Sequence, residues 1–113
     1  MCVTANDGGT DYLYVLGGYD NVQSYSTVYY ADIQGGGVLG TWQTTTVLPF
    51  VNSYADVVVA GGAIYMIGGY DGGNVGYSDV WWSQVQSGGT LGGWYSTAPL
   101  PSGRRMTAAV TIP

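Results

Sequence analysis

The feature that most constrains this chain is that it repeats itself. Residues 12–20 align with residues 63–71 at an offset of 51, and after one extra loop residue, 26–61 align with 78–113 at an offset of 52. In the second alignment 12 of the 36 positions are identical. A period near 50 residues without helix signals is typical of propellers and solenoids, in which each unit buries its apolar faces only against its neighbours.

Each repeat is a series of short predicted strands separated by glycine-rich turns. Aromatic and β-branched residues fill the strands, and the tight turn at 60–63 suits a hairpin between adjacent antiparallel strands. The predicted strands are 12–16, 27–33, 41–46, 54–60, 64–67, 79–85, 94–97 and 106–112. The predicted fold class is therefore all-β, with one four-stranded antiparallel sheet per repeat.

The composition excludes several kinds of function. The chain has seven Asp, no Glu, Lys or His, and a net charge of -5, with Arg104 and Arg105 as its only cations. An electrostatic nucleic-acid surface is excluded by this balance, and catalysis or metal binding that needs histidine is excluded outright. The lone Cys2 cannot form an internal disulfide, and Gly and Pro break the uncharged stretches, which argues against a membrane span. We expect no enzyme activity and no cofactor.

The repeated motif carries a family resemblance. A hydrophobic strand ends in a glycine pair, an aromatic-rich strand follows, and a tryptophan comes about a dozen residues later. The matching positions are Gly17-Gly18 and Gly68-Gly69, Tyr14 and Tyr65, Tyr29 and Trp81, and Trp42 and Trp94. The pattern resembles the kelch repeat, which implies blades of a β-propeller. We expect these residues to be structural, the glycines where blades crowd together and the tryptophans as wedges between blades.

Two blades do not close a ring. Residues 1–53 are interpreted as a first kelch-type blade whose first strand is short or shared, followed by a longer hairpin, and residues 54–103 as a second blade. Residues 104–113 hold an extra first-type strand that could complete a neighbouring blade, as kelch propellers commonly do. Because two blades leave apolar faces uncovered, we expect three or four copies in a ring, or further repeats of a longer chain.

Candidate binding residues lie in the loops after the glycine pairs and before the first strand of each repeat, where the kelch resemblance implies that ligands dock. They are Tyr19, Asp20, Tyr25, Tyr70, Asp71, Asn74, Tyr77, Arg104 and Arg105. Such side chains suit peptides or sugars. Alternatively the tyrosines pack on a neighbouring blade and the arginines pair with its aspartates. The spacing of a calcium loop is missing, so we expect the aspartates to cap their own turns and bind no metal.

These observations predict a non-enzymatic binding or assembly module that presents loops to a protein partner and self-associates into a closed ring. The alternative is a carbohydrate-binding, lectin-like module of a secreted or surface protein, favoured by loop tyrosines that stack on sugars. The scarcity of charge favours an extracellular or cell-surface setting.

Overall fold

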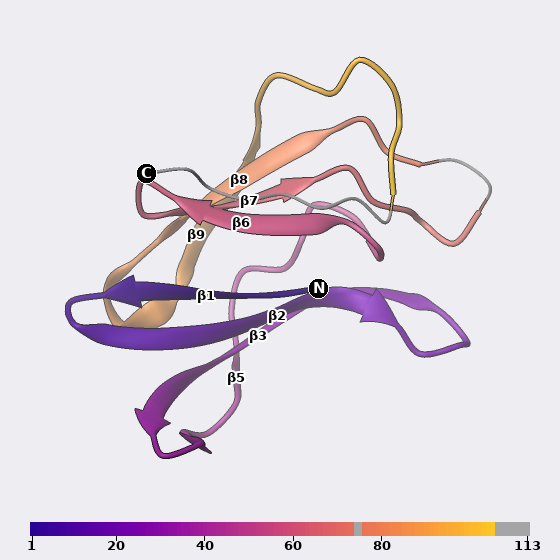
Figure 1. Ribbon diagram of the computed structural model, residues 1–113. Coiled ribbons are helices and arrows are strands. Elements are labelled where there is room, and N and C mark those ends of the chain that lie inside the picture. Colours follow the sequence, from indigo (N-terminus) through magenta and orange to yellow (C-terminus); the bar gives the residue numbers. More distant parts are fainter. Residues whose placement is uncertain (74–75, 106–113) are drawn as a thin grey trace.

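Two antiparallel sheets form the fold of the computed structural model, which describes residues 1–73 and 76–105 (Figure 1). The first sheet contains β1 (Cys2–Asp7), β2 (Thr10–Tyr19), β3 (Ser24–Gly35), β4 (Val38–Leu39) and β5 (Gln43–Thr44). The second contains β6 (Asp56–Ala60), β7 (Ala63–Ile67), β8 (Val80–Val85) and β9 (Leu91–Ser96), with a 3₁₀ turn at Ser87–Gly89 before β9. The prediction of an all-β chain with two antiparallel sheets is confirmed.

The two sheets begin with matching hairpins. In each, a two-residue glycine turn joins the first strand to the second, closed by the pairs Asp7↔Thr10 and Ala60↔Ala63. All four turn glycines have positive φ, the backbone that a type I′ hairpin requires. The first strand of the chain was expected to be short, but β1 has six residues and pairs with β2 along its whole length.

The strands that correspond to predicted ones begin and end within three residues of the predicted positions, and two predicted strands are shortened by two residues or more. Tyr54 has φ 58°, outside the range of extended backbone, so the first strand of the second sheet begins at Asp56 instead of residue 54. The strand predicted at 41–46 is reduced to β5, which pairs with β3 beside the short β4. Its counterpart β9 is continuous and is held against the first sheet. The strand predicted at 106–112 lies outside the described residues.

The core lies between the two sheets. Side chains of one face of β2 and β3 pack against side chains of one face of β7. The strands β1 and β6 lie beside each other (Figure 1). The largest fully buried apolar side chains among the described residues are Tyr14, Leu16, Val28, Ile64 and Met66. Since both sheets contribute to one cluster, each sheet depends on the other for the burial that stabilises it.

Hydrogen bonds across this interface fix the sheets relative to each other. The buried Tyr14 hydroxyl donates to the carbonyl of Gly89 at 2.6 Å. Thr46 Oγ1 donates to the Leu91 carbonyl at 2.8 Å, and the Trp94 indole donates to the Thr46 carbonyl at 3.4 Å. Trp94 therefore packs between the two sheets. The equivalent Trp42 is on the outer side of the first sheet and is 44% exposed.

Candidate functional site

Asn52, in the connection between the sheets, joins the glycine pairs of both repeats. Its backbone contacts the first sheet: its carbonyl accepts from Gly18 N–H at 2.9 Å and its N–H donates to the Tyr25 carbonyl at 3.2 Å. Its fully buried side chain contacts the second sheet, where Oδ1 accepts from Tyr70 N–H at 2.9 Å and Nδ2 donates to the Gly68 carbonyl at 3.1 Å. One residue thus satisfies buried polar groups of two sheets.

This contact explains why glycine is needed at both sites. A Cβ on Gly17 would lie 2.5 Å from the Asn52 carbonyl oxygen, and a Cβ on Gly69 would overlap the Asn52 carboxamide. Both glycines also have positive φ, 53° and 112°. At both positions glycine is needed because another part of the chain approaches closely, namely the connection at Gly69, and the connection together with β3 of the same sheet at Gly17.

Arg104 is the repeat equivalent of Asn52, and its backbone makes the same contacts one sheet further along. Its N–H donates to the Tyr77 carbonyl at 2.9 Å, and its carbonyl accepts from Gly69 N–H at 2.7 Å. The side chains differ, because the Arg104 guanidinium is exposed and donates to Ser102 Oγ and the Gly103 carbonyl.

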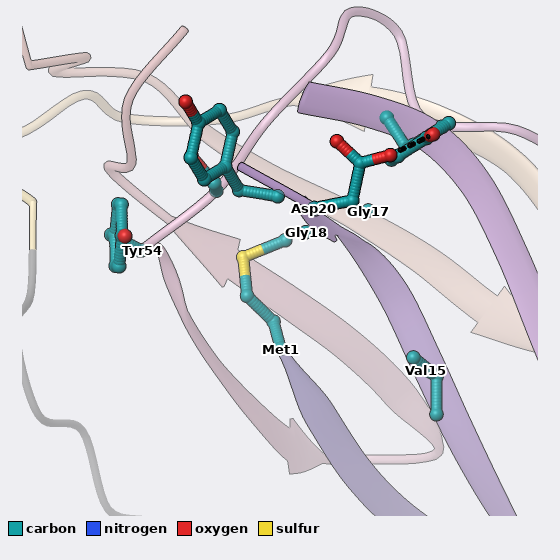
Figure 2. A pocket seen from close by; sticks show the side chains of 9 residues that line it. Met1, Val15, Gly17, Gly18, Asp20 and Tyr54 are labelled. Atoms are coloured by element: carbon teal, nitrogen blue, oxygen red, sulfur yellow. Dashed lines mark hydrogen bonds between the residues drawn. The ribbon is translucent and has the colours of Figure 1, made fainter. Parts of the chain in front are cut away.

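A cleft of about 580 Å³ opens beside the first glycine pair, and we call it the loop-face cleft. Figure 2 shows Tyr54 and Asp20 on opposite sides of it, with Met1 between them. Its other lining residues are Val15, Gly17, Gly18, Tyr19, Tyr25 and Ser53. A smaller hollow of about 250 Å³ continues from Tyr19, Ser53 and Tyr54 to Tyr70 and Arg105. The cleft therefore adjoins both repeats.

Asp20 supplies the negative charge of this cleft. Its Oδ1 accepts from the backbone N–H groups of Val22 and Gln23 at 2.8 and 2.9 Å, and its Oδ2 accepts from the Tyr25 hydroxyl at 2.5 Å. The Tyr25 hydrogen bond, followed by those from the backbone, holds the pKa of Asp20 below its usual value, so the exposed carboxylate is ionised at neutral pH. The expectation that Asp20 caps its own turn is confirmed.

The second repeat places its candidate residues differently. The Arg105 guanidinium lies 4.1 Å from the centroid of the Tyr70 ring, and the rings of Tyr70 and Tyr54 are 6.2 Å apart. Asp71 caps its own turn by accepting from Gly73 N–H at 2.7 Å. Asn74 lies outside the described residues.

Tyr77 packs toward the connection between the sheets. Its ring centroid is 4.5 Å from that of Phe50, and its hydroxyl donates to the Val51 carbonyl at 3.3 Å. Burial, with smaller contributions from the charges of Asp71 and Asp79, raises the pKa of Tyr77. Tyr77 therefore packs on the connection between the two sheets and does not line the loop-face cleft.

Sequence reasoning placed the loop at 50–53 on the candidate face but singled out neither Asn52 nor Ser53, and it placed Tyr54 in a strand. Ser53 is buried and forms an antiparallel bridge with Tyr70, while Tyr54 presents a ring that is 43% exposed to the cleft. The alignment of Asn52 with Arg104 was the available signal, since both residues precede a first strand in the repeat.

Neither a metal-binding cluster of the described residues nor a likeness to a known protein points to a particular function for this site. Within residues 1–73 and 76–105, no three His, Cys, Asp or Glu side chains gather closely enough to hold a metal ion. The described part of the chain also has no helix long and apolar enough to cross a membrane. Neither the protein-family models nor the curated proteins give a match to this sequence.

Proposed function

We propose that the chain is a non-enzymatic binding and assembly module, whose two kelch-type blades self-associate into a closed ring and present their loop face to a protein partner. One observation carries this proposal. Within residues 1–73 and 76–105, two sheet faces have no other sheet packed on them, and they are the repeat equivalents of the two faces that pack together in the core. Each open face therefore resembles one of the two surfaces that pack against each other within the chain.

The open face of the first sheet is an apolar surface with a shallow hollow. Val15, Tyr29 and Trp42 line this hollow, which has a volume of about 310 Å³. At the repeat offsets they correspond to Met66, Trp81 and Trp94. Those three residues belong to the face of the second sheet that packs against the first, so the open face has the character of a buried one.

The open face of the second sheet carries a row of aromatic side chains. Tyr65, Trp82 and Tyr95 are paired across β7, β8 and β9, and the rings of Trp82 and Tyr95 are 5.3 Å apart. At the repeat offsets Tyr65 and Trp82 correspond to Tyr14 and Tyr30, which are buried in the core. The second sheet of one copy therefore offers to the first sheet of another copy the kind of surface that β2 and β3 offer within the chain.

This arrangement is head-to-tail, because the two open faces are different. Head-to-tail interfaces generate rings when the rotation between units closes. With two blades per chain, three or four copies would give six or eight blades, within the range known for propellers. Further repeats of a longer chain would use the same faces.

The native mass of the chain tests this proposal. We expect a discrete species of three or four copies by native mass spectrometry, in equilibrium with single chains on dilution. Trp42→Asp should abolish the larger species, because it places a charge in the apolar hollow. Val47→Asp is the matched control, since it adds the same charge at an exposed residue of the connection that lines neither the apolar hollow nor the loop-face cleft. A wild-type chain that stays monomeric at all concentrations contradicts self-association.

The loop-face part of the proposal has its own test. A protein partner that docks there should lose affinity when Tyr19 or Tyr70 is replaced by alanine. If both variants retain every interaction of the wild-type chain, the loop face is not where partners dock.

A second candidate function is carbohydrate binding, and the aromatic lining of the cleft favours it. Tyr19, Tyr54 and Tyr70 present rings beside the hydrogen-bonding groups of Asp20 and Arg105, a combination that suits sugar hydroxyls and sugar faces. A broad glycan panel should then show a ligand whose binding is lost in Tyr54→Ala. A panel with no binding at millimolar concentration contradicts this candidate.

A further inference from the structure

We propose that Arg104 of one copy enters the loop-face cleft of the next copy, where its guanidinium pairs with Asp20 beside Gly18. This inference rests on the proposed self-association and names the polar contact that fixes its register. It gives the cleft a ligand of defined chemistry, the guanidinium group of a second copy of this chain.

The connection within the chain is the template for this contact. The backbone of Asn52 is bound to the first sheet, and its side chain crosses to the second sheet, where it meets Gly68, Gly69 and Tyr70. The crossing places a polar side chain in the narrow space that the glycine pair leaves open.

Arg104 occupies the position in the second repeat that Asn52 occupies in the first. Within the described residues, however, no sheet follows Arg104. Its backbone holds the same two hydrogen bonds to the preceding sheet. The repeat equivalent of the space that Asn52 fills at Gly69 is the space at Gly18. There a Cβ would have no atom of the described residues within 4 Å. The cleft beside Gly18 is thus open on the side from which the preceding sheet of another copy would approach.

The guanidinium of Arg104 and the acceptor groups of the loop-face cleft are chemically complementary. A guanidinium has five N–H donors and a longer reach than a carboxamide, so it needs a wider receiving site with acceptors. The cleft is wide at Gly18, and Asp20 lines it with an ionised carboxylate. The carbonyl of Gly17 corresponds to that of Gly68, which accepts from Asn52 in the chain. Because each chain carries a net charge of -5, copies repel one another in general, and a junction that pairs Arg104 with Asp20 offsets this repulsion locally.

Charge reversal in two separate variants tests the pairing. Arg104→Asp places two aspartates at every junction, and Asp20→Arg places two arginines there. Each variant alone should raise the dissociation constant of the assembly at least about tenfold. When the two variants are mixed, Asp at position 104 of one meets Arg at position 20 of the other, and Arg104 of the second meets Asp20 of the first. Because alternating order needs an even copy number, a four-copy ring should recover in the mixture. A single chain that carries both Arg104→Asp and Asp20→Arg restores an opposite pair at every junction for any copy number, so it should assemble as tightly as the wild-type chain.

The matched control is Arg105→Asp, which changes the net charge by the same amount next to the same position. Because the Arg105 guanidinium lies over Tyr70 of its own chain, this variant should alter the dissociation constant by less than about threefold. If the wild-type chain assembles but Arg104→Asp and Arg105→Asp behave alike, or the chain with both charge reversals fails to recover, this pairing is wrong while self-association stands. A wild-type chain that never assembles overturns both.

Discussion

The Asn52 carboxamide occupies the space that a side chain at position 69 would need, so Asn52 and Gly69 form one structural unit. Asn52 Oδ1 accepts from the N–H of the residue after Gly69, and a Cβ on Gly69 would overlap that carboxamide. The glycine pair of this fold is thus explained by a residue of the connection, at the point where one sheet meets the next.

The two glycine pairs allow a matched test of this relationship. Gly18 and Gly69 have nearly the same φ, 109° and 112°, but only Gly69 faces the Asn52 side chain. Gly18→Ala should lower the free energy of unfolding by about 2 kcal/mol through backbone strain alone. Gly69→Ala should lower it by about 2 kcal/mol more, because the methyl group also displaces Asn52. Urea unfolding at concentrations where the chain is monomeric measures both, and equal losses would contradict the overlap.

Asn52 itself should be sensitive to substitution. Asn52→Ala leaves the Tyr70 N–H and the Gly68 carbonyl without their partner, and we expect a loss of about 3 kcal/mol in the free energy of unfolding. Asn52→Asp keeps the shape and the acceptor but turns the Gly68 contact into a repulsion and buries a charge. The aspartate variant should therefore be unstable at neutral pH and recover stability as the pH falls and the carboxylate is protonated. A pH-independent Asn52→Asp variant would contradict this account.

Replacing the two equivalent tryptophans should affect different properties, namely the stability of the single chain at Trp94 and its assembly at Trp42. Trp94 packs on the core and donates to the Thr46 carbonyl, so Trp94→Ala should lower the free energy of unfolding by about 3 kcal/mol. Trp42 lies on the open face, so Trp42→Ala should change the stability of a single chain by less than about 0.5 kcal/mol. Its effect should appear instead as a loss of the assembled species. Thermal unfolding and native mass, measured on both variants, separate the two effects.

Tyr14 should make the fold sensitive to alkali. Burial, and then its tyrosine neighbours Tyr12 and Tyr30, raise the pKa of Tyr14 well above the usual value of 10.0. In the unfolded chain the phenol loses its proton near pH 10, so above that pH the unfolded state binds fewer protons than the folded one. The contribution to stability is complete below pH 10 and is lost as the pH rises toward the folded pKa.

The check is to compare the wild-type chain with Tyr14→Phe by urea unfolding from pH 8 to pH 11. The variant loses the hydrogen bond to the Gly89 carbonyl, so it should be about 1 kcal/mol less stable at pH 8. Its stability should then decline less steeply above pH 10. Parallel slopes in the two proteins would show that Tyr14 is not the responsible group.

Much of the fold was predictable from the sequence, because the two repeats align strand-forming segments with strand-forming segments and glycine turns with glycine turns. Strands between paired glycines specified antiparallel sheets, and the two-residue hairpin at 60–63 was predicted as observed. The hairpin at Gly8-Gly9 was predicted as a longer one, over residues 6–11, whereas Asp7 pairs with Thr10 and leaves only two residues in the turn. The aligned strands begin at Tyr12 in the sequence, but β2 begins at Thr10. Tyr54 was predicted to lie in a strand because aromatic residues favour strands, and the sequence carries no sign of its positive φ.

The candidate site was harder to predict. The loop tyrosines and aspartates were named from position alone, and the structure separates them: Asp20 and Tyr25 meet, Tyr70 lies under Arg105, and Tyr77 packs on Phe50. Asn52 was overlooked because its role depends on both repeats at once, with its backbone on one sheet and its side chain on the other. A periodic pattern shows what the repeats share, and Asn52 and Arg104 are where they differ.

The position of the core determines when the chain can fold during its synthesis. The apolar cluster draws on both halves of the sequence, and the Tyr14 hydroxyl finds its acceptor 75 residues later. The first hairpins can form early from local contacts, but they gain their stabilising partner only when the second half has been made. We therefore expect a nascent chain that stops before β7 to remain loosely ordered and open to proteases, and order to arrive in a single late step as the second sheet docks.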